Sequence, residues 1–562
     1  MARMNQAMTD LLRYNAALLP RRRSRFAKGH SHTTTFDSGY LVPLMVDRVL
    51  PGDEKKITYN GLARMATPLH PVMDQAFFDV WCFYVPDRLW YGHAKEFYGE
   101  NKYADFNPDG EYVMPHVKPS QYAVIDDENY KGPVGMPLGS LNDYFGMPVM
   151  TPGVTSVRDQ DSRNFVQAGL WRSYQLIWNE WFRNASIQPA LQLNTGDEVT
   201  PEEWDVIKQI RKVNKLPDYF TTLLKEPQAG PDVLLPLGDY APVVTRENHL
   251  STAKTYEPLL FADTDARIID DRALLGVSSA GYVNTAGKTD ASGTELTPAN
   301  LWADLTNQSA ATISNLRAAI TTQHLLELHN MAGKRYQQII QMVWGCLTGD
   351  STLQRPELCG TYRSEVGMRQ VLSTTETDSV PLGATGAYSL TNVNDALICN
   401  KAFTESGYLF VLGSIRPVIS YSQGLNCLWT QLTPYEMYQP PFDGISNQPV
   451  YGYEIYMGNN ATNEELHRPL GYKPAFMEYR IMQNRVSGLM RPEVRQTLSS
   501  WNYSLNFDDM PVLDSEFIAV DPSFMDRAIA TPDEPQFIVD SYFAYEDTRS
   551  MSVNATPGID KI

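Results

Sequence analysis

Positive charge is concentrated in the first thirty residues, where it could neutralise phosphate groups. The candidate residues are Arg13, Arg21, Arg22, Arg23, Arg25 and Lys28. Asp10 is the single acid in this stretch, although the whole chain has a net charge of −18. Lysine and arginine bind phosphates without regard to base sequence, and arginine also stacks on unpaired bases. The pattern predicts a nucleic-acid-binding arm over residues 1–35, and the alternative is a solvated tail without a partner.

A second group of basic residues stands near the end of the chain. Its members are Arg480, Arg485, Arg491 and Arg495. Acids are interleaved with these arginines, among them Glu478 and Glu493. We therefore favour ion pairing between subunits over nucleic-acid binding for this group.

Metal-ligating and catalytic patterns are scarce. The five cysteines are Cys82, Cys346, Cys359, Cys399 and Cys427. They form no CxxC pair, and His324 and His329 miss the spacing of a zinc-binding helix. The chain has no GxSxG or GxGxxG motif. We expect no catalytic residue, no metal site and no cofactor, and hence no enzyme, although glycosidase carboxylate pairs have no fixed sequence spacing.

The scaffold that would position these residues is predicted to be mainly β. Runs at 40–46, 56–59 and 408–412 are typical of strands. The run 77–85 is apolar at both alternating positions, which predicts a strand buried on both faces. Residues 51–53 read Pro-Gly-Asp, a turn sequence in which proline fixes φ and glycine accepts positive φ.

A helix with an aromatic stripe is predicted over residues 165–186. Trp171, Tyr174, Trp178 and Trp181 recur there at spacings of three and four. Such a stripe is typical of core packing, and the alternative is a platform on which sugars stack.

Two further helices are predicted, one from a capping pattern at its start and one from the periodicity of its apolar residues. Thr200 and Pro201 suit the cap and first position of a helix, and Glu203 could reach back to the cap amide. Apolar periodicity from 311 to 345 predicts another helix, which Gly333 interrupts. From 431 onward the chain is crowded with Pro, Tyr and Gly, so we expect long loops with little regular structure.

Composition bounds the class of protein. The chain has 562 residues, of which 43% are hydrophobic and 20% charged, as in folded proteins of two or three domains. The acidic balance excludes a globally basic nucleic-acid binder. The few unpaired cysteines favour a reducing compartment. We find no apolar run long enough to span a membrane and no signal peptide, so we expect synthesis in a cytoplasm without membrane insertion.

Several blocks of the sequence resemble the major capsid protein of microviruses, of the gokushovirus type. These blocks are 41–53, Ala63–Pro68, Pro71–Asp74, Phe83–Trp90, Tyr174–Arg183, Asp218–Thr221, Leu353–Glu357, Glu478–Arg480 and Arg485–Gly488. Each block alone is weakly specific, but their order and spacing cover nearly the whole chain. Residues 238–310 match nothing in the family.

The resemblance implies an eight-stranded antiparallel jelly roll with long loop and helical insertions. It implies a T = 1 icosahedral shell of about sixty copies around circular single-stranded DNA. The expected domains are the arm 1–35, a first jelly-roll part with a helical insertion over 36–237, a surface protrusion over 238–310, and a second part with extended loops over 311–562.

The implied partners are further copies of this chain and packaged single-stranded DNA. Scaffolding and minor virion proteins and a host surface receptor are further candidates, the last through the protrusion. The implied location is the virion, assembled in the cytoplasm of a bacterial host. The alternative from another class is a carbohydrate-binding or carbohydrate-active jelly-roll protein, which the aromatic content and acidic charge would also suit. Such proteins are usually exported, which the missing signal peptide disfavours.

Overall fold

A computed structural model describes residues 23–100, 112–118, 139–147, 165–233, 313–376, 381–383 and 385–554, with short strands between 243 and 303. The chain divides into two compact units. One comprises Met1–Pro227 with His329–Ile562, and the other comprises Gln228–Leu328.

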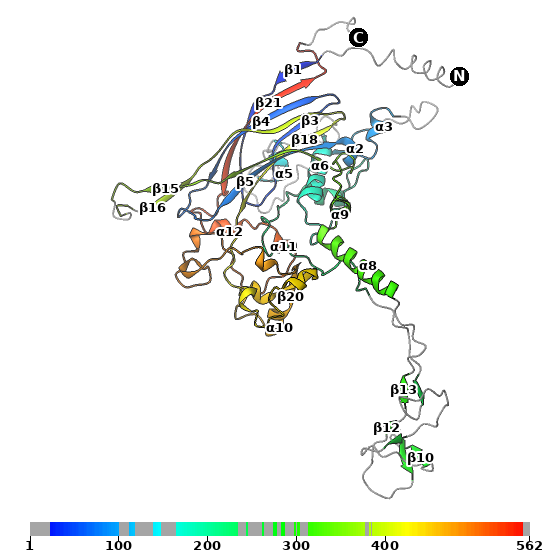
Figure 1. Ribbon diagram of the computed structural model, residues 1–562. Helices are drawn as coiled ribbons and strands as arrows, with labels where there is room; N and C mark the ends of the chain where they lie inside the picture. Colours follow the sequence, from blue (N-terminus) through cyan, green and yellow to red (C-terminus); the bar gives the residue numbers. More distant parts are fainter. Residues whose placement is uncertain are drawn as a thin grey trace, which may run out of the picture. The chain divides into compact units, whose positions relative to one another are not determined.

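Two antiparallel sheets form the centre of the first unit (Figure 1). The five-stranded sheet has the order β1-β21-β4-β17, and β2 also pairs with β21. Its strands are β1 (Ser24–Ala27), β2 (His30–Phe36), β4 (Glu54–Met65), β17 (Thr391–Ala402) and β21 (Phe537–Arg549). The four-stranded sheet has the order β14-β5-β18-β3. Its strands are β3 (Val42–Val49), β5 (Ala76–Pro86), β14 (Glu357–Glu365) and β18 (Gly407–Pro417).

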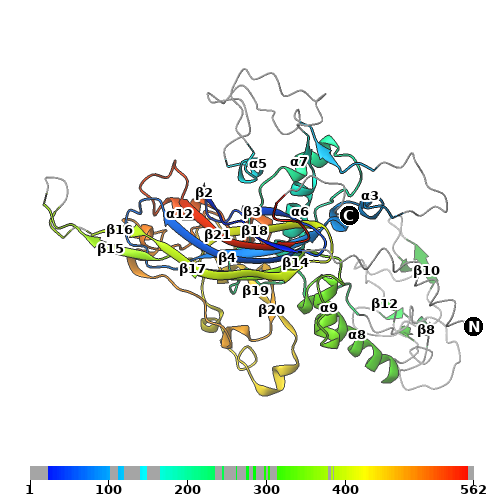
Figure 2. The same ribbon diagram turned by 90° about the horizontal axis from the view of Figure 1, so that it is seen from above.

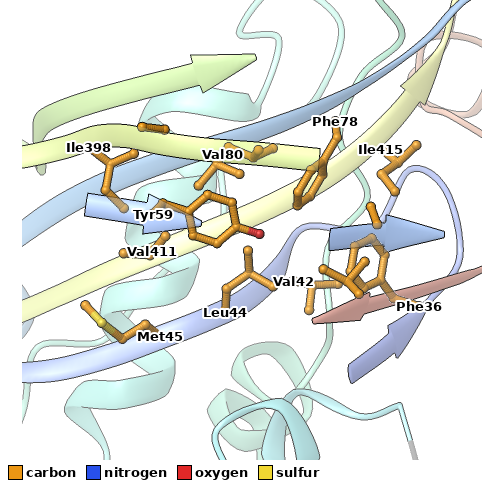
Figure 3. Close-up of a cluster of buried hydrophobic side chains, with 14 of the residues drawn as sticks. Phe36, Val42, Leu44, Met45, Tyr59, Phe78, Val80, Ile398, Val411 and Ile415 are labelled. Atoms are coloured by element: carbon orange, nitrogen blue, oxygen red, sulfur yellow. The ribbon is translucent and has the colours of Figure 1, made fainter. Parts of the chain in front are cut away.

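The two sheets share one core because their side chains alternate between inside and outside. In β21, Phe537, Val539 and Phe543 are buried, whereas Ile538 and Tyr542 are exposed. This period of two is the signature of a strand with one buried face. Figure 3 shows the centre of the core, to which both sheets contribute; its residues include Tyr59, Phe78, Val80, Ile398, Val411 and Ile415.

A layer of helices covers the other face of the four-stranded sheet (Figure 2). Its elements are α2 (Asp87–Trp90), α3 (Ala94–Phe97), α5 (Leu141–Tyr144), α6 (Gly169–Ile177), the π-helical turn η2 (Trp178–Phe182) and α7 (Pro201–Ile207). Phe83 and Phe410 of the sheet pack against Trp171 and Tyr174 of α6. The prediction that residues 77–85 form a doubly buried strand is confirmed.

The predicted helices and turn are confirmed with one correction. The region 311–345 forms α8 (Ile313–Ala332) and α9 (Tyr336–Trp344), and Gly333 between them has a φ of +98°. Gly52 in the turn before β4 has a φ of +86°. The Thr200 hydroxyl accepts a hydrogen bond from the Glu203 amide, as predicted. The Glu203 carboxylate, however, pairs with Arg172 and does not reach the cap amide, because the buried guanidinium of Arg172 is a stronger partner than an amide.

The C-terminal region consists of loops and short elements around a third apolar cluster that includes Phe220, Val450 and Phe517. The elements are β19 (Asn447–Tyr451), α10 (Asn463–His467), β20 (Pro469–Pro474), α11 (Ser515–Ile518), α12 (Ser523–Asp526) and several 3-10 turns. The expectation of little regular structure after 431 is wrong for β21, which is central in its sheet. Two small ladders complete the unit: β6 (His116–Val117) with β7 (Val166–Gln167), and β15 (Met368–Leu372) with β16 (Thr385–Ser389).

The second unit contains three short antiparallel ladders. They pair β8 (Val243–Thr245) with β13 (Leu301–Ala303), β9 (Phe261–Ala262) with β12 (Thr297–Pro298), and β10 (Leu274–Val277) with β11 (Val283–Ala286). The pairs are nested, so the later three strands pair with the earlier three in reverse order. Most of the expected protrusion 238–310 lies outside the described residues.

The molecule is thus mostly antiparallel β-sheet with some helices, as the strand patterns predicted. Among the described helices, none combines the length and the apolar character that crossing a membrane would need.

Candidate nucleic-acid and subunit interfaces

The six basic residues predicted to bind nucleic acid divide into two groups. Arg13, Arg21 and Arg22 lie outside the described residues. Arg23, Arg25 and Lys28 are described, and they stand at the beginning of the five-stranded sheet. The described end of the predicted arm therefore forms β1 and β2, which pair with β21.

The two described arginines already have partners on neighbouring elements. Arg23 Nη2 donates to the Gly52 carbonyl oxygen at 2.6 Å, which fixes the chain next to the turn before β4. Arg25 forms an ion pair with Glu546 of β21, and its side chain is 63% exposed. Exposed pairs of this kind contribute little to stability, so the Arg25 guanidinium remains open to a competing phosphate.

Lys28, which follows β1, is held more firmly, in a network of charges with residues of β3, β4 and β21. Lys28 Nζ lies 2.7 Å from Asp547 Oδ2 and 3.4 Å from Asp47 Oδ2. Lys55 Nζ lies 2.6 Å from Asp47 and 3.4 Å from Asp547. Arg549 Nη2 lies 2.7 Å from Asp547 and from Asp53. We call Lys28, Asp47, Asp53, Lys55, Asp547 and Arg549 the charge network.

Because charges in this network are buried, the stability of each one depends on its partners. The side chains of Lys55 and Asp547 are inaccessible to solvent. Burial by itself raises the pKa of Asp47, but the charge of Lys55 and the hydrogen bonds from Lys55 and Tyr545 outweigh it, so the pKa of Asp47 is lowered. A buried charge whose partner is removed is strongly destabilising, because the remaining charge has no solvent. The network therefore fixes the start of the folded chain to its last strand.

Among the described residues, one ion pair involves the second arginine group. Arg491 Nη1 lies 3.3 Å from Glu493. Glu478 instead pairs with Lys473 at 3.0 Å. Arg480, Arg485 and Arg495 are exposed and, within the part of the chain that the structure describes, form no ion pair. Pairing between subunits, the interpretation favoured from the sequence, stays a prediction.

Apolar side chains gather on the surface of the C-terminal loops. Leu432 and Met482 are 85% and 88% exposed. The rings of Tyr438 and Tyr479 lie 6.3 Å apart, and the Tyr479 hydroxyl donates to Gln431, so these loops lie together. Further exposed members are Trp429, Tyr435, Met437, Ile445, Ile481 and Leu489. Aromatic residues and methionine are enriched in protein interfaces, so this loop surface is a candidate subunit contact.

The aromatic stripe of α6 serves the core. Trp171 and Tyr174 are fully buried, and Trp178 is nearly so. Trp171 Nε1 donates to Asn142 at 2.6 Å, and the Tyr174 hydroxyl donates to the Leu41 carbonyl at 2.7 Å. Rings in this position cannot stack on a sugar, so the prediction that this stripe packs in the core is confirmed.

One surface pocket, with a volume of about 930 Å³, is lined by both polar and apolar groups. Its buried carboxylate, Asp87, accepts hydrogen bonds from Arg48, Trp90 and Tyr98. Glu405, a second acid of the lining, pairs with Arg88 at 2.7 Å. Asp87 and Glu405, two of the four acids that line this pocket, are therefore engaged by cations.

Three cysteines that the sequence left unconnected meet in space. The sulfur atoms of Cys82, Cys359 and Cys399 all lie within 4.8 Å of one another. Hydrogen bonds from the other two thiols, with the charges of Lys401 and Lys55, lower the pKa of Cys399. No sequence signal could have found this cluster, because its members lie on three strands whose pairing is not readable from spacing.

Comparison with known proteins matches almost the entire chain. A family model described as capsid protein (F protein) matches residues 19–559. Capsid protein VP1 of Chlamydia phage 1 is 32% identical and covers 96% of both chains. Capsid protein VP1 of Spiroplasma virus 4 is 31% identical over 100% of this chain and 99% of its own. Capsid protein VP1 of Bdellovibrio phage phiMH2K is 30% identical over 95% of each.

Proposed function

The chain belongs to the phage capsid protein (F protein) family, and from this premise we propose that about sixty copies close a T = 1 shell around circular single-stranded DNA. The observation that carries the proposal is the family match over residues 19–559, which spans nearly all of the 562 residues. The protein is a structural component of a virion. Assembly in the cytoplasm of a bacterial host, with scaffolding and minor virion proteins, is part of the proposal.

We infer that the two facing sheets are an eight-stranded jelly roll. In chain order, its strands would be β2, β3, β4, β5, β14, β17, β18 and β21. The sheet orders β2-β21-β4-β17 and β3-β18-β5-β14 support this, since the two sheets take strands from the chain in the interleaved manner of a jelly roll. β1 would then be an addition at one edge of β21. Such a wedge leaves few open strand edges, which suits a subunit that must contact copies of itself in fixed places.

The exposed apolar loop surface supports self-association. Each copy would place it against a neighbour, and one patch would be used at every equivalent symmetry position. Arg480, Arg485 and Arg495 would meet acids of the adjacent copy there.

Packaged DNA would be contacted by Arg13, Arg21, Arg22, Arg23, Arg25 and Lys28. The local excess of positive charge supports this on an otherwise acidic chain. Because Lys28 belongs to the charge network, we propose that it anchors the arm and that the residues before it make most of the phosphate contacts. Counterion release would make this binding weaker as salt rises.

The segment 238–310 would be the surface protrusion that meets a host receptor. Its nested ladders support an excursion from the shell, because the strands pair with one another and with no strand of the large sheets in the described residues.

The coat-protein function is tested by light scattering and electron microscopy of the purified chain, alone and co-expressed with candidate scaffolding proteins and single-stranded DNA. Sixty times the chain mass of 63.4 kDa predicts a closed particle of about 3,800 kDa. A chain that stays monomeric under all these conditions would contradict the proposal. In particles, neutralising Arg21, Arg22, Arg23 and Arg25 together is expected to lower DNA content without blocking assembly.

A further inference from the structure

The cysteine cluster lies where the two sheets meet at one edge. Cys82 is in β5 and Cys359 in β14, both strands of the four-stranded sheet, and Cys399 is in β17 of the five-stranded sheet. Cys82 and Cys399 are fully buried, and Cys359 is partly buried. The cluster therefore joins the two layers, next to the ion pair between Lys401 of β17 and Glu357 of β14.

Two irregularities in strand pairing bring the sulfurs together. The register of β14 against β5 shifts between Leu358 and Gly360, so Cys359 has no partner in β5. The register of β17 against β4 shifts between Leu397 and Cys399. Bulges of this kind bend a strand and redirect a side chain. Here they direct Cys359 and Cys399 toward Cys82.

The backbones are also unusually close beside the cluster. A methyl group at Gly360 would lie 2.4 Å from the Ile398 carbonyl oxygen, so only glycine permits this approach of β14 to β17. Two strands thus approach each other closely, and each carries a cysteine next to its bulge. This backbone geometry holds the three thiols close together.

The three possible metal ligands are all cysteine sulfurs, which are soft donors. No histidine, aspartate or glutamate of the described residues lies close enough to be a fourth ligand of the group. Glu357, two residues before Cys359, is occupied by an ion pair with Lys401. Zinc prefers four ligands in structural sites, whereas thiolates without other donors select soft ions such as Cu(I).

We propose that Cys82, Cys359 and Cys399 form a trigonal thiolate site for one soft metal ion of the Cu(I) class. On binding, each thiol releases its proton to solvent and its sulfur forms a bond to the metal, with no change in oxidation state. The metal offsets part of the negative charge of the three thiolates, and Lys55 and Lys401, which also pair with Asp47 and Glu357, act electrostatically on Cys399. Metal binding would then clamp the two sheets to each other at this edge.

The test is a titration of the full-length chain with Cu(I), reduced and metal-free at the start. A chromogenic Cu(I) chelator of known affinity competes for the metal and reports how much the protein retains. The expected result is one equivalent per chain, with X-ray absorption showing sulfur neighbours alone. Cys359→Ser and Cys399→Ser are each expected to lower affinity by more than the roughly 10–100-fold cost of losing an outer-shell contact.

The chain provides two matched controls. Cys346→Ser removes an exposed thiol and Cys427→Ser a buried thiol outside the cluster, and both should leave Cu(I) affinity unchanged. Circular dichroism and the thermal midpoint of each metal-free variant show whether it folds, and Cys359→Ala is the second choice if a serine variant does not.

Four results would overturn the proposal. They are failure to retain Cu(I) against the chelator, equal loss in the Cys346 or Cys427 variants, tighter binding of zinc than of Cu(I), or formation of a disulfide within the cluster before metal can bind. The site is independent of capsid assembly, because the titration uses the unassembled chain.

Discussion

The ammonium of Lys28 lies 2.7 Å from the carboxylate of Asp547, which no solvent reaches. The contact joins the residue after β1 to the last buried polar residue of β21. Lys28 is therefore a basic residue that stabilises the fold, whereas the basic residues before it could reach DNA.

Asp547→Ala is expected to destabilise the subunit by about 3–5 kcal/mol, because it leaves Lys28, Lys55 and Arg549 without a shared buried carboxylate. Urea unfolding of the dissociated protein measures the change. Asp540→Asn, on the exposed face of the same strand, is the control and should stay within about 0.5 kcal/mol. Similar effects of the two substitutions would contradict the role of the charge network.

Lowering the pH should reduce the stability of the subunit, in part through protonation of Asp47. Its pKa is lowered in the folded state, so the folded protein binds fewer protons than the unfolded chain as the pH falls. The stability that Asp47 contributes is fully present above its unfolded pKa, about 3.9, and is lost as pH falls through the folded pKa. Asp47→Asn should reduce the loss of unfolding free energy at low pH, measured by urea unfolding across pH. An unchanged loss would show that other carboxylates cause it.

Arginine position should matter more than arginine number for DNA content. Arg21→Gln with Arg22→Gln removes the same charge as Arg23→Gln with Arg25→Gln, but Arg23 and Arg25 have protein partners. The first pair of substitutions should therefore lower DNA per particle more, measured by absorbance and density-gradient sedimentation. Equal losses would mean that only total charge counts.

The buried pair of Arg172 and Glu203 should be essential for the helical layer. Both side chains are almost inaccessible, and two hydrogen bonds of 2.7 and 3.1 Å join them. Glu203→Gln leaves a buried guanidinium without its counter-charge and should cost about 3–5 kcal/mol in urea unfolding. Glu202→Gln, exposed in the same turn, serves as the control.

The loop surface should be needed for assembly and dispensable for folding. Leu432→Glu and Met482→Glu place charge on side chains that are already exposed, so the unfolding midpoint of the single chain should not move. Particles detected by light scattering should be lost, since a charge in a subunit contact lacks a partner. Leu432→Met keeps the apolar character and should assemble. Normal particles from the glutamate variants would place the contact elsewhere.

Sequence patterns predicted those elements in which the spacing of apolar residues reflects which faces are buried. The doubly apolar run in β5 and the aromatic spacing of α6 were both readable, because burial on two faces or one stripe leaves a period. β21 also alternates from Phe537 to Tyr545, but polar residues at Asp540 and Ser541 weaken its apolar pattern.

The sites depend on pairings that no local pattern specifies. The basic residues were visible, but the partners of Lys28 lie some 20 and 500 positions away along the chain. The cysteine cluster depends on two bulges in different sheets, and an irregular register leaves no compositional trace. The Glu203 carboxylate matched a capping pattern, yet the buried charge of Arg172 offered a stronger partner than an exposed amide.

The place of β21 in its sheet imposes an order on synthesis. β21 lies between β4 and the first two described strands, so within the described sheet β1 and β2 meet their partner only after residues 537–549 have left the ribosome. A chain that stops before β21 would expose unpaired strand edges and part of the core. Synthesis of β21 therefore acts as a checkpoint: a nascent coat subunit cannot present a finished surface to its neighbours before this strand is made.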